Sequence, residues 1–171
     1  LITLKANPVS PVALGGLRAI IKRGCSRIVR PLAALVCTAE GHDMSKRLLI
    51  AGNWKMNGSL AALAEAFTID EVAKKYDGVE VALAPPAVLI TPMAVRTVHL
   101  LVGAQDCHAA EKGAHTGNHS AAMLSEAGAR FAIIGHSERR ADQAETSADV
   151  AAKAGTLSAA EMDIILCVGE P

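Results

Sequence analysis

The chain has 171 residues, of which 51% are hydrophobic and 20% charged, a composition typical of one globular domain and not of a disordered chain. Its 17 Lys and Arg balance its 17 Asp and Glu, which argues against a nucleic-acid-binding protein, because neutralising phosphates requires an excess of basic residues. No run of 18 apolar residues occurs and the four cysteines lack CxxC spacing, so the sequence predicts no membrane-spanning helix, disulfide framework or zinc ribbon, and favours a reducing compartment.

The first 43 residues differ in composition from the rest of the chain. They carry six Lys and Arg against two acidic residues, whereas residues 44–171 carry eleven against fifteen. Residues 14–30 have the pattern of a basic amphipathic helix, and such arginine-rich leaders are typical of organelle transit peptides. However, Met44-Ser45-Lys46-Arg47 has the character of a native start. This favours the interpretation that residues 1–43 come from upstream sequence that was fused to, or mistranslated in front of, a native start at Met44. We therefore expect residues 1–43 to be an extension outside the fold formed by residues 44–171.

Five short apolar runs follow at intervals of roughly 20–30 residues and predict five strands. The runs are continuous rather than alternating, as expected of parallel strands that are covered on both faces. The predicted strands cover residues 48–52, 79–84, 100–104, 131–134 and 163–168.

Amphipathic stretches between these runs predict helices over residues 59–76, 87–97, 120–127 and 145–160. Ser59 and Thr146 are candidate N-caps of the first and last of these helices. Strands that alternate with helices in this way build either an open doubly wound sheet or a closed barrel. Five strands are too few to close a barrel.

Polar residues cluster where the predicted strands end. Glycine and polar groups follow the apolar runs in Gly52-Asn53-Trp54-Lys55, Gly103-Ala104-Gln105-Asp106, Gly135-His136-Ser137-Glu138 and Gly169-Glu170. The carboxyl ends of parallel strands carry the chemistry in α/β folds. The pattern therefore indicates an enzyme whose site is assembled from separate loops.

His136 and Lys55 are the main candidates for chemistry at this edge. The residues after His136 begin a helical turn, whose free N–H groups disfavour a charged ring, and a neutral imidazole can donate a hydrogen bond to a substrate carbonyl. Lys55 offers a point charge to a phosphate or a developing enolate, and Asn53 can bind the same ligand. The alternative without a catalytic role is that His136 is a packed structural residue and Lys55 a solvated surface side chain. Glu138 is either a second acid–base group or a carboxylate stabilised by the helix dipole.

Two blocks of sequence resemble the triosephosphate isomerase family. They are Ala-Gly-Asn-Trp-Lys-Met-Asn at residues 51–57 and Ile-Gly-His-Ser-Glu-Arg-Arg at residues 134–140, with supporting matches at 103–105, 112–117 and 167–170. The resemblance covers residues 48–171. It implies an α/β fold of the TIM (β/α)8 barrel type, truncated in this chain to about the first five strand–helix units.

The resemblance also implies a function and its residues. Such an enzyme interconverts dihydroxyacetone phosphate and D-glyceraldehyde 3-phosphate in glycolysis and gluconeogenesis, in the cytoplasm, by proton transfer through an enediolate and without cofactor or metal. His136 would be the catalytic electrophile, a tuned neutral histidine known from this family. Asn53 and Lys55 would bind substrate and stabilise the enediolate, with Ser137 and Glu138 in support. Thr116 would lie in the loop that enters the partner of a homodimer.

The chain departs from the family pattern in three ways. Asp106 and Asn118 occur where members usually have Asn and Glu, and the second change removes a carboxylate expected to meet Arg139 across the dimer interface, so we expect a weaker dimer. Pro171 replaces the usual hydroxyl residue after Gly-Glu. The family's general-base glutamate, lid and phosphate loops would lie beyond residue 171, so we expect the isolated chain to be inactive.

Two alternatives from other functional classes remain open. A metal-binding module would use Cys107, His108, His115 and His119, although this stretch lacks the paired short spacings of structural zinc sites. A non-catalytic half-barrel would bind a partner through its open sheet edge, since an unpaired edge strand readily pairs with another chain.

Overall fold

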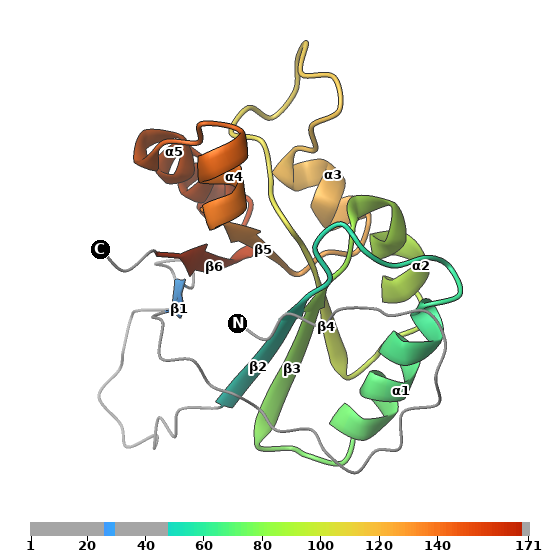
Figure 1. Cartoon of the computed structure of the whole chain (residues 1–171). Helices are drawn as coiled ribbons and strands as arrows, with labels where there is room; N and C mark the ends of the chain where they lie inside the picture. The colour runs from blue at the N-terminus through green and yellow to red at the C-terminus, as the bar shows by residue number, and fades with distance from the viewer. Residues whose placement is uncertain (1–25, 30–47, 169–171) are drawn as a thin grey trace, which may run out of the picture.

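The computed structural model describes residues 26–29 and 48–168. Six strands and their connecting helices make up this part of the chain (Figure 1). In chain order they are β1 (Ser26–Val29), β2 (Leu48–Asn53), α1 (Leu63–Ala73), β3 (Val79–Ala84), η2 (Ala87–Leu89), α2 (Ile90–Ala94), β4 (Leu100–Ala104), α3 (Ala121–Glu126), β5 (Phe131–Ile134), α4 (Ser137–Asp142), α5 (Ser147–Ala159) and β6 (Asp163–Cys167).

The strands form one curved sheet in the order β1-β6-β5-β4-β3-β2. Strands β2 to β6 are parallel and neighbours in sequence are neighbours in the sheet. Helices alternate with these five strands and lie along the outer side of the curve (Figure 1). The prediction of a (β/α)8 barrel truncated to about five strand–helix units is confirmed, and the predicted strands match to within one residue.

Strand β1 was not expected from the sequence. Its backbone pairs antiparallel with β6, in a register that places Ser26 opposite Cys167 and Val29 opposite Ile164. These four residues are therefore extended, and the helix predicted over residues 14–30 is wrong for them. The remainder of that predicted helix, the rest of residues 1–43, and the Gly169-Glu170 strand ending lie outside the described residues.

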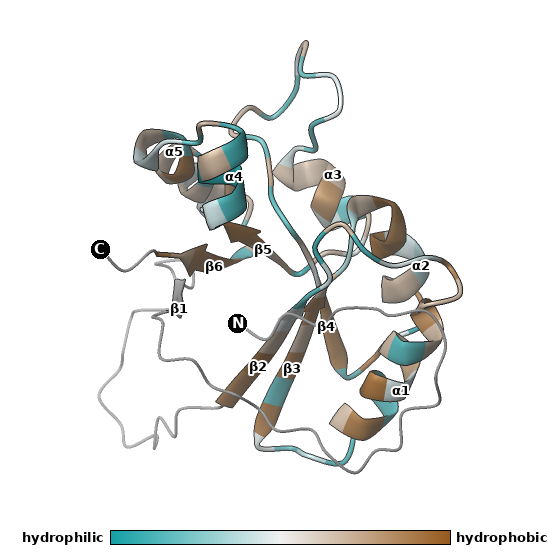
Figure 2. Ribbon diagram, viewed as in Figure 1, coloured by the Kyte–Doolittle hydropathy of each residue, from teal (hydrophilic) through white to brown (hydrophobic). Residues whose placement is uncertain are grey.

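The apolar side chains divide between the two faces of the sheet. One face packs against the helices and includes Leu83, Val102 and Ile134. The other face lines the inside of the curve with a smaller cluster, Ala82, Ala84, Phe131, Ile133 and Ile165. The strands are accordingly strongly apolar (Figure 2). All of β5 is buried, as predicted, but the amino-terminal half of β2 is only partly buried.

The helix boundaries follow local chemistry. Thr146 forms the predicted cap of α5, because its hydroxyl accepts from the Asp149 N–H while the Asp149 carboxylate accepts from the Thr146 N–H. Ser59 instead caps a turn, accepting from the Ala62 N–H at 3.3 Å, and α1 begins only at Leu63. In the described part of the chain, none of the helices has the length and apolar character that crossing a membrane requires.

Candidate active site

The carboxyl ends of β2 and β5 bring Asn53 and His136 together. Asn53 ends β2 and His136 follows β5 after Gly135, and both side chains are buried. The Asn53 Nδ2 lies 3.5 Å from the His136 Nε2, at the outer limit of a hydrogen bond. Two of the three residues predicted to contact substrate therefore meet, although they are 83 positions apart in the chain.

Lys55 adopts a left-handed backbone conformation with φ of 52°. This region costs a residue other than glycine roughly 1–2 kcal/mol, and such strain is concentrated at functional sites. Two contacts hold the conformation: the Lys55 N–H donates to the Asn53 Oδ1 at 2.7 Å, and the Gln105 Nε2 donates to the Lys55 carbonyl at 2.8 Å. The turn after β2 is thus held both by Asn53 and by Gln105, which follows β4.

The Lys55 ammonium forms an ion pair with the Glu138 carboxylate, which lies in the first turn of α4. The two side chains remain 40% and 48% exposed. An ion pair this exposed contributes only about 0–1 kcal/mol. An anionic ligand that approaches Lys55 can therefore compete with Glu138 for the ammonium group.

The His136 ring is kept neutral mainly by burial. Burial lowers the pKa of His136, against the opposing effects of Glu138, Asp106 and Glu145, which favour the charged ring. The predicted cause was different, because the N–H groups of α4 were expected to face the ring. His136 is the N-cap residue of α4, but its side chain makes no capping hydrogen bond, and its Nδ1 lies 3.9 Å from the Cys167 Sγ.

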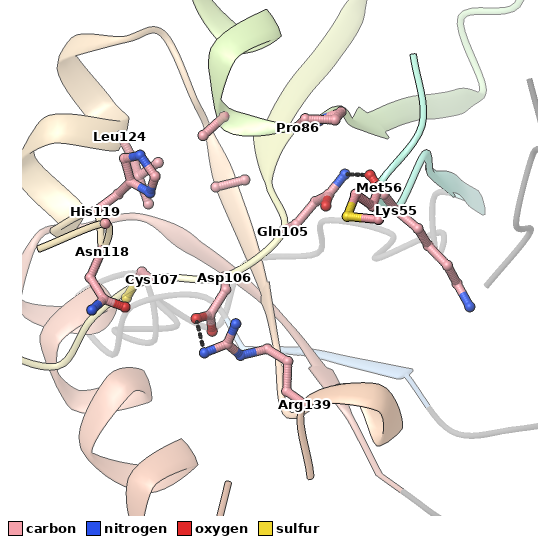
Figure 3. Close-up of a pocket in the computed structure, with 13 residues that line it drawn as sticks. Lys55, Met56, Pro86, Gln105, Asp106, Cys107, Asn118, His119, Leu124 and Arg139 are labelled. Carbon is pink, nitrogen blue, oxygen red and sulfur yellow. Dashed lines mark hydrogen bonds and ion pairs between the residues drawn. The ribbon is translucent and has the colours of Figure 1, made fainter. Parts of the chain in front are cut away.

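A cavity of about 280 Å³ opens beside this site (Figure 3). Lys55 and Met56 line one wall, where Gln105 reaches the Lys55 backbone, and Asp106 and Arg139 face each other on another wall. The remaining lining residues are Pro86, Ala87, Ala104, Cys107, Gly117, Asn118, His119 and Leu124. The cavity therefore offers both a cation and hydrogen-bonding groups at the edge of the sheet.

Four charged side chains, two of them on the cavity wall and two buried, form a group here named the charge cluster: Asp106, Arg139, Glu145 and Lys153. Arg139 was expected to lack its carboxylate partner, but its guanidinium lies 3.0 Å from Asp106 and 3.2 Å from Glu145 of the same chain. Glu145 and Lys153 were missed by the sequence reasoning. A signal was present, because Lys153 shares the buried stripe of α5 with Val150 and Leu157.

Two other predicted residues are exposed. Ser137 is exposed at the first position of α4. Thr116 lies in the exposed loop 111–119 between β4 and α3, which projects from the body of the molecule (Figure 1). Within one chain, the described structure brings together Asn53, Lys55, His136 and Glu138.

The residues of the alternative metal site lie near one another without forming a ligand set. The His108 and His115 rings lie with centroids 4.0 Å apart, tilted by 31°, and the His108 Nδ1 accepts from the Ala110 N–H at 3.0 Å. Cys107 is buried, and burial is the main cause that raises its pKa to about 11, which disfavours the thiolate that binds metals. Over residues 26–29 and 48–168, no three His, Cys, Asp or Glu side chains are arranged to hold a metal ion. The contacts thus give the metal-binding alternative no support.

Comparison with known proteins identifies the family. A family model described as triosephosphate isomerase matches residues 48–171. The chain belongs to the triosephosphate isomerase family. Its sequence is 53% identical over 127 residues to the triosephosphate isomerase of Dinoroseobacter shibae, covering 73% of this chain and 51% of that protein. The corresponding enzyme of Caulobacter vibrioides is 51% identical over 127 residues, covering 72% and 50%.

A solved structure supports the same relationship. The crystal structure of triosephosphate isomerase from Bartonella henselae aligns with a TM-score of 0.67 and 39% identity, covering 72% of this chain and 52% of that one. The chain thus spans about half the length of the curated relatives it matches. The matched half contains the sheet edge with Asn53, Lys55 and His136.

The pH dependence of stability is expected to carry a contribution from His136 of this isomerase-family chain. Burial lowers its pKa below the ordinary 6.5, so the unfolded chain binds a proton there more readily than the folded chain. The contribution is therefore present above pH 6.5 and is lost as pH falls through that value toward the folded pKa, by at most about 1.4 kcal/mol per pH unit. Urea unfolding between about pH 7.5 and 5.5 measures this slope.

The matched variants for this experiment are His136→Gln and His99→Gln, the second at an exposed histidine. The His136→Gln variant should show a shallower pH slope than the parent chain, and the His99→Gln variant should keep the parent slope. Equal slopes in all three proteins would contradict a buried, neutral His136.

Proposed function

We propose that the carboxyl-terminal sheet edge is the triose-phosphate site of a triosephosphate isomerase. The observation that carries the proposal is the approach of Asn53 and His136, which places an amide and a neutral imidazole 3.5 Å apart beside the Lys55 ammonium. A triose phosphate has a carbonyl oxygen, which can accept from the N–H groups of Asn53 and His136, and a phosphate group, which can bind the Lys55 cation.

Each group has a distinct role in the proposed reaction. A carbonyl oxygen between Asn53 and His136 would accept from both side chains, replacing their long mutual contact. A neutral imidazole can polarise the carbonyl by donating from one ring nitrogen, provided that this nitrogen carries the proton. Lys55 would leave Glu138 and stabilise the negative charge that grows on the enediolate oxygen.

We also propose that the 171-residue chain alone does not turn over substrate. Isomerisation needs a base to move a proton between adjacent carbons. Among the described residues of the candidate site, none is assigned as this base; Glu138, the carboxylate nearest Lys55, pairs with that lysine in the unliganded chain. The curated relatives are about twice the length of the region that matches, so half of their fold has no counterpart in these 171 residues.

The proposal extends to the organisation of the protein. The family match begins at residue 48, which supports residues 44–171 as the isomerase part and residues 1–43 as an extension, of which residues 26–29 add strand β1 to the sheet. The activity of the family supports glycolysis, gluconeogenesis and the cytoplasm as its setting. The proposed reaction requires only side-chain acids, bases and cations, so it involves no cofactor.

A homodimer is the proposed assembly, with the Thr116 loop of one protomer entering the cavity of the other. Residues 111–119 are exposed throughout. Met56, which lines the cavity, is 95% exposed, and Val88, which follows the cavity-lining Ala87, is 83% exposed. Exposed apolar side chains beside a cavity are typical of an interface. Analytical ultracentrifugation of the purified chain tests the assembly, and a monomer at all concentrations would contradict it.

Ligand binding to the purified 171-residue chain tests the site. In amide NMR spectra, dihydroxyacetone phosphate should shift resonances of residues 53–55 and 135–138, and glycerol 3-phosphate, which lacks the carbonyl, should bind more weakly. A coupled assay on the same sample should show no isomerisation above the buffer rate. Normal turnover would overturn the proposed inactivity. If the chain folds cooperatively but does not bind dihydroxyacetone phosphate, the proposed site is wrong. That result would favour the alternative of a non-catalytic half-barrel that binds a partner.

A further inference from the structure

Lys153 occupies an unusual position for a lysine. It lies on the buried side of α5, and its side chain is only 9% exposed. An ammonium group has three N–H donors. All three find acceptors here, because Nζ contacts both Asp106 oxygens, at 2.7 and 2.9 Å, and the Glu145 Oε1.

These contacts join separate parts of the sheet edge. Asp106 follows β4, Glu145 precedes α5, and both carboxylates also bind Arg139 of α4. The Glu145 Oε2 is buried without a hydrogen-bond partner among the described residues. Glu145 is therefore held through one oxygen by two cations, and loss of Lys153 would leave Arg139 as its remaining ion-pair partner.

We propose that Lys153 is a positioning residue for the candidate active site, because its bridge between Asp106 and Glu145 holds α4, and with it His136, against the end of β4. Lys153 touches neither His136 nor the proposed substrate position. It acts through Arg139 and the start of α4, where Glu138 meets Lys55. This inference rests on the proposed function only in treating His136 as a site residue.

The electrostatic surroundings of His136 make the proposal measurable. The charged and titratable groups that face it from the elements packed around it are Lys55 after β2, Asp106 after β4, Glu138, Arg139 and Arg140 of α4, Glu145 before α5, and Cys167 of β6. Asp106 and Glu145 both favour the charged ring. The charge cluster contains two cations and two carboxylates, so removing Lys153 leaves it with one uncompensated negative charge.

Titration of His136 by NMR in the unliganded 171-residue chain tests the inference, with its ring signal assigned by its loss in His136→Gln. The Lys153→Met variant should move the His136 titration to higher pH, and it should shift the amide signals of residues 136–140. The Lys153→Arg variant should restore the parent titration, because it keeps the charge.

A second pair of variants keeps the inference testable if Lys153→Met does not fold. Asp106→Asn removes a carboxylate, so it should move the His136 titration to lower pH. The Lys153→Met/Glu145→Gln double variant restores the charge balance without the bridge, so its titration should return toward the parent value while the amide signals of residues 136–140 stay shifted. Parent-like amide signals of residues 136–140 in every folded variant that lacks the Lys153 bridge would overturn the inference. Because no substrate is present, shifted titrations without triose-phosphate binding would contradict the proposed function alone.

Discussion

Replacing Asp70 by alanine is expected to lower the free energy of unfolding of this chain by about 3 kcal/mol or more. Asp70 lies on α1 and is 6% exposed. Its Oδ1 accepts three backbone N–H groups, those of Val98 at 3.0 Å, His99 at 2.7 Å and Leu100 at 2.7 Å. Alanine would leave all three donors without this acceptor, and leaving a buried donor unpaired costs about 1–3 kcal/mol.

The size of this effect matters because domains are stable by only about 5–15 kcal/mol. Urea unfolding followed by circular dichroism gives the difference directly. The matched control is Asp70→Asn, which keeps an Oδ1 acceptor but removes the charge that strengthens these bonds, so it should cost clearly less than alanine. A loss below about 1 kcal/mol in Asp70→Ala would show that water replaces the carboxylate.

The Asp70 contacts also bear on the site. They fix the entry to β4, and β4 carries Gln105 and Asp106 at its other end. Gln105 supports the Lys55 turn and Asp106 joins the charge cluster. Because Asp70 contacts the start of β4 and the site residues follow its end, we expect Asp70→Ala to weaken ligand binding only as far as it unfolds the chain.

The five parallel strands, β2 to β6, are predictable from sequence because each is a short, mostly apolar run, whereas β1 was not predicted. The run 131–134 matches β5 in both bounds, and all four residues are buried. Helix bounds were less accurate, because tertiary contacts decide them. Pro86 and Pro92 flank or enter the segment predicted as one helix over 87–97, which is a 3₁₀ turn followed by five α-helical residues.

The candidate site was predictable only in part. Asn53, Lys55 and His136 lie at the end of a strand or within two residues of it, so parallel topology alone predicts that they share an edge. Asp70, Glu145 and Lys153 act through contacts 6 to 47 positions away in sequence. Neither periodicity nor strand order indicates which carboxylate a buried lysine will meet. The left-handed backbone of Lys55 was also not predictable, because lysine has no preference for it.

Exchanging Lys55 for glycine is expected to separate function from stability. Removal of the ammonium should weaken binding of dihydroxyacetone phosphate by about 10- to 100-fold, since a hydrogen bond to a charged group contributes about 1.5–3 kcal/mol. The free energy of unfolding should hardly fall, because the ion pair with Glu138 is exposed and worth at most about 1 kcal/mol. Glycine also adopts the positive φ of this position without strain, which should raise the free energy of unfolding.

The control is Lys55→Ala, which removes the same charge but keeps a Cβ at φ of 52°. Both variants should lose binding equally, whereas the glycine variant should be more stable than the alanine variant by about 1 kcal/mol. Lys75, an exposed lysine that follows α1 and is not among the candidate site residues, serves as the control position, and Lys75→Ala should leave binding unchanged. If glycine and alanine variants unfold at the same urea concentration, the Lys55 backbone is not strained. If they bind as the parent chain does, the phosphate is held elsewhere.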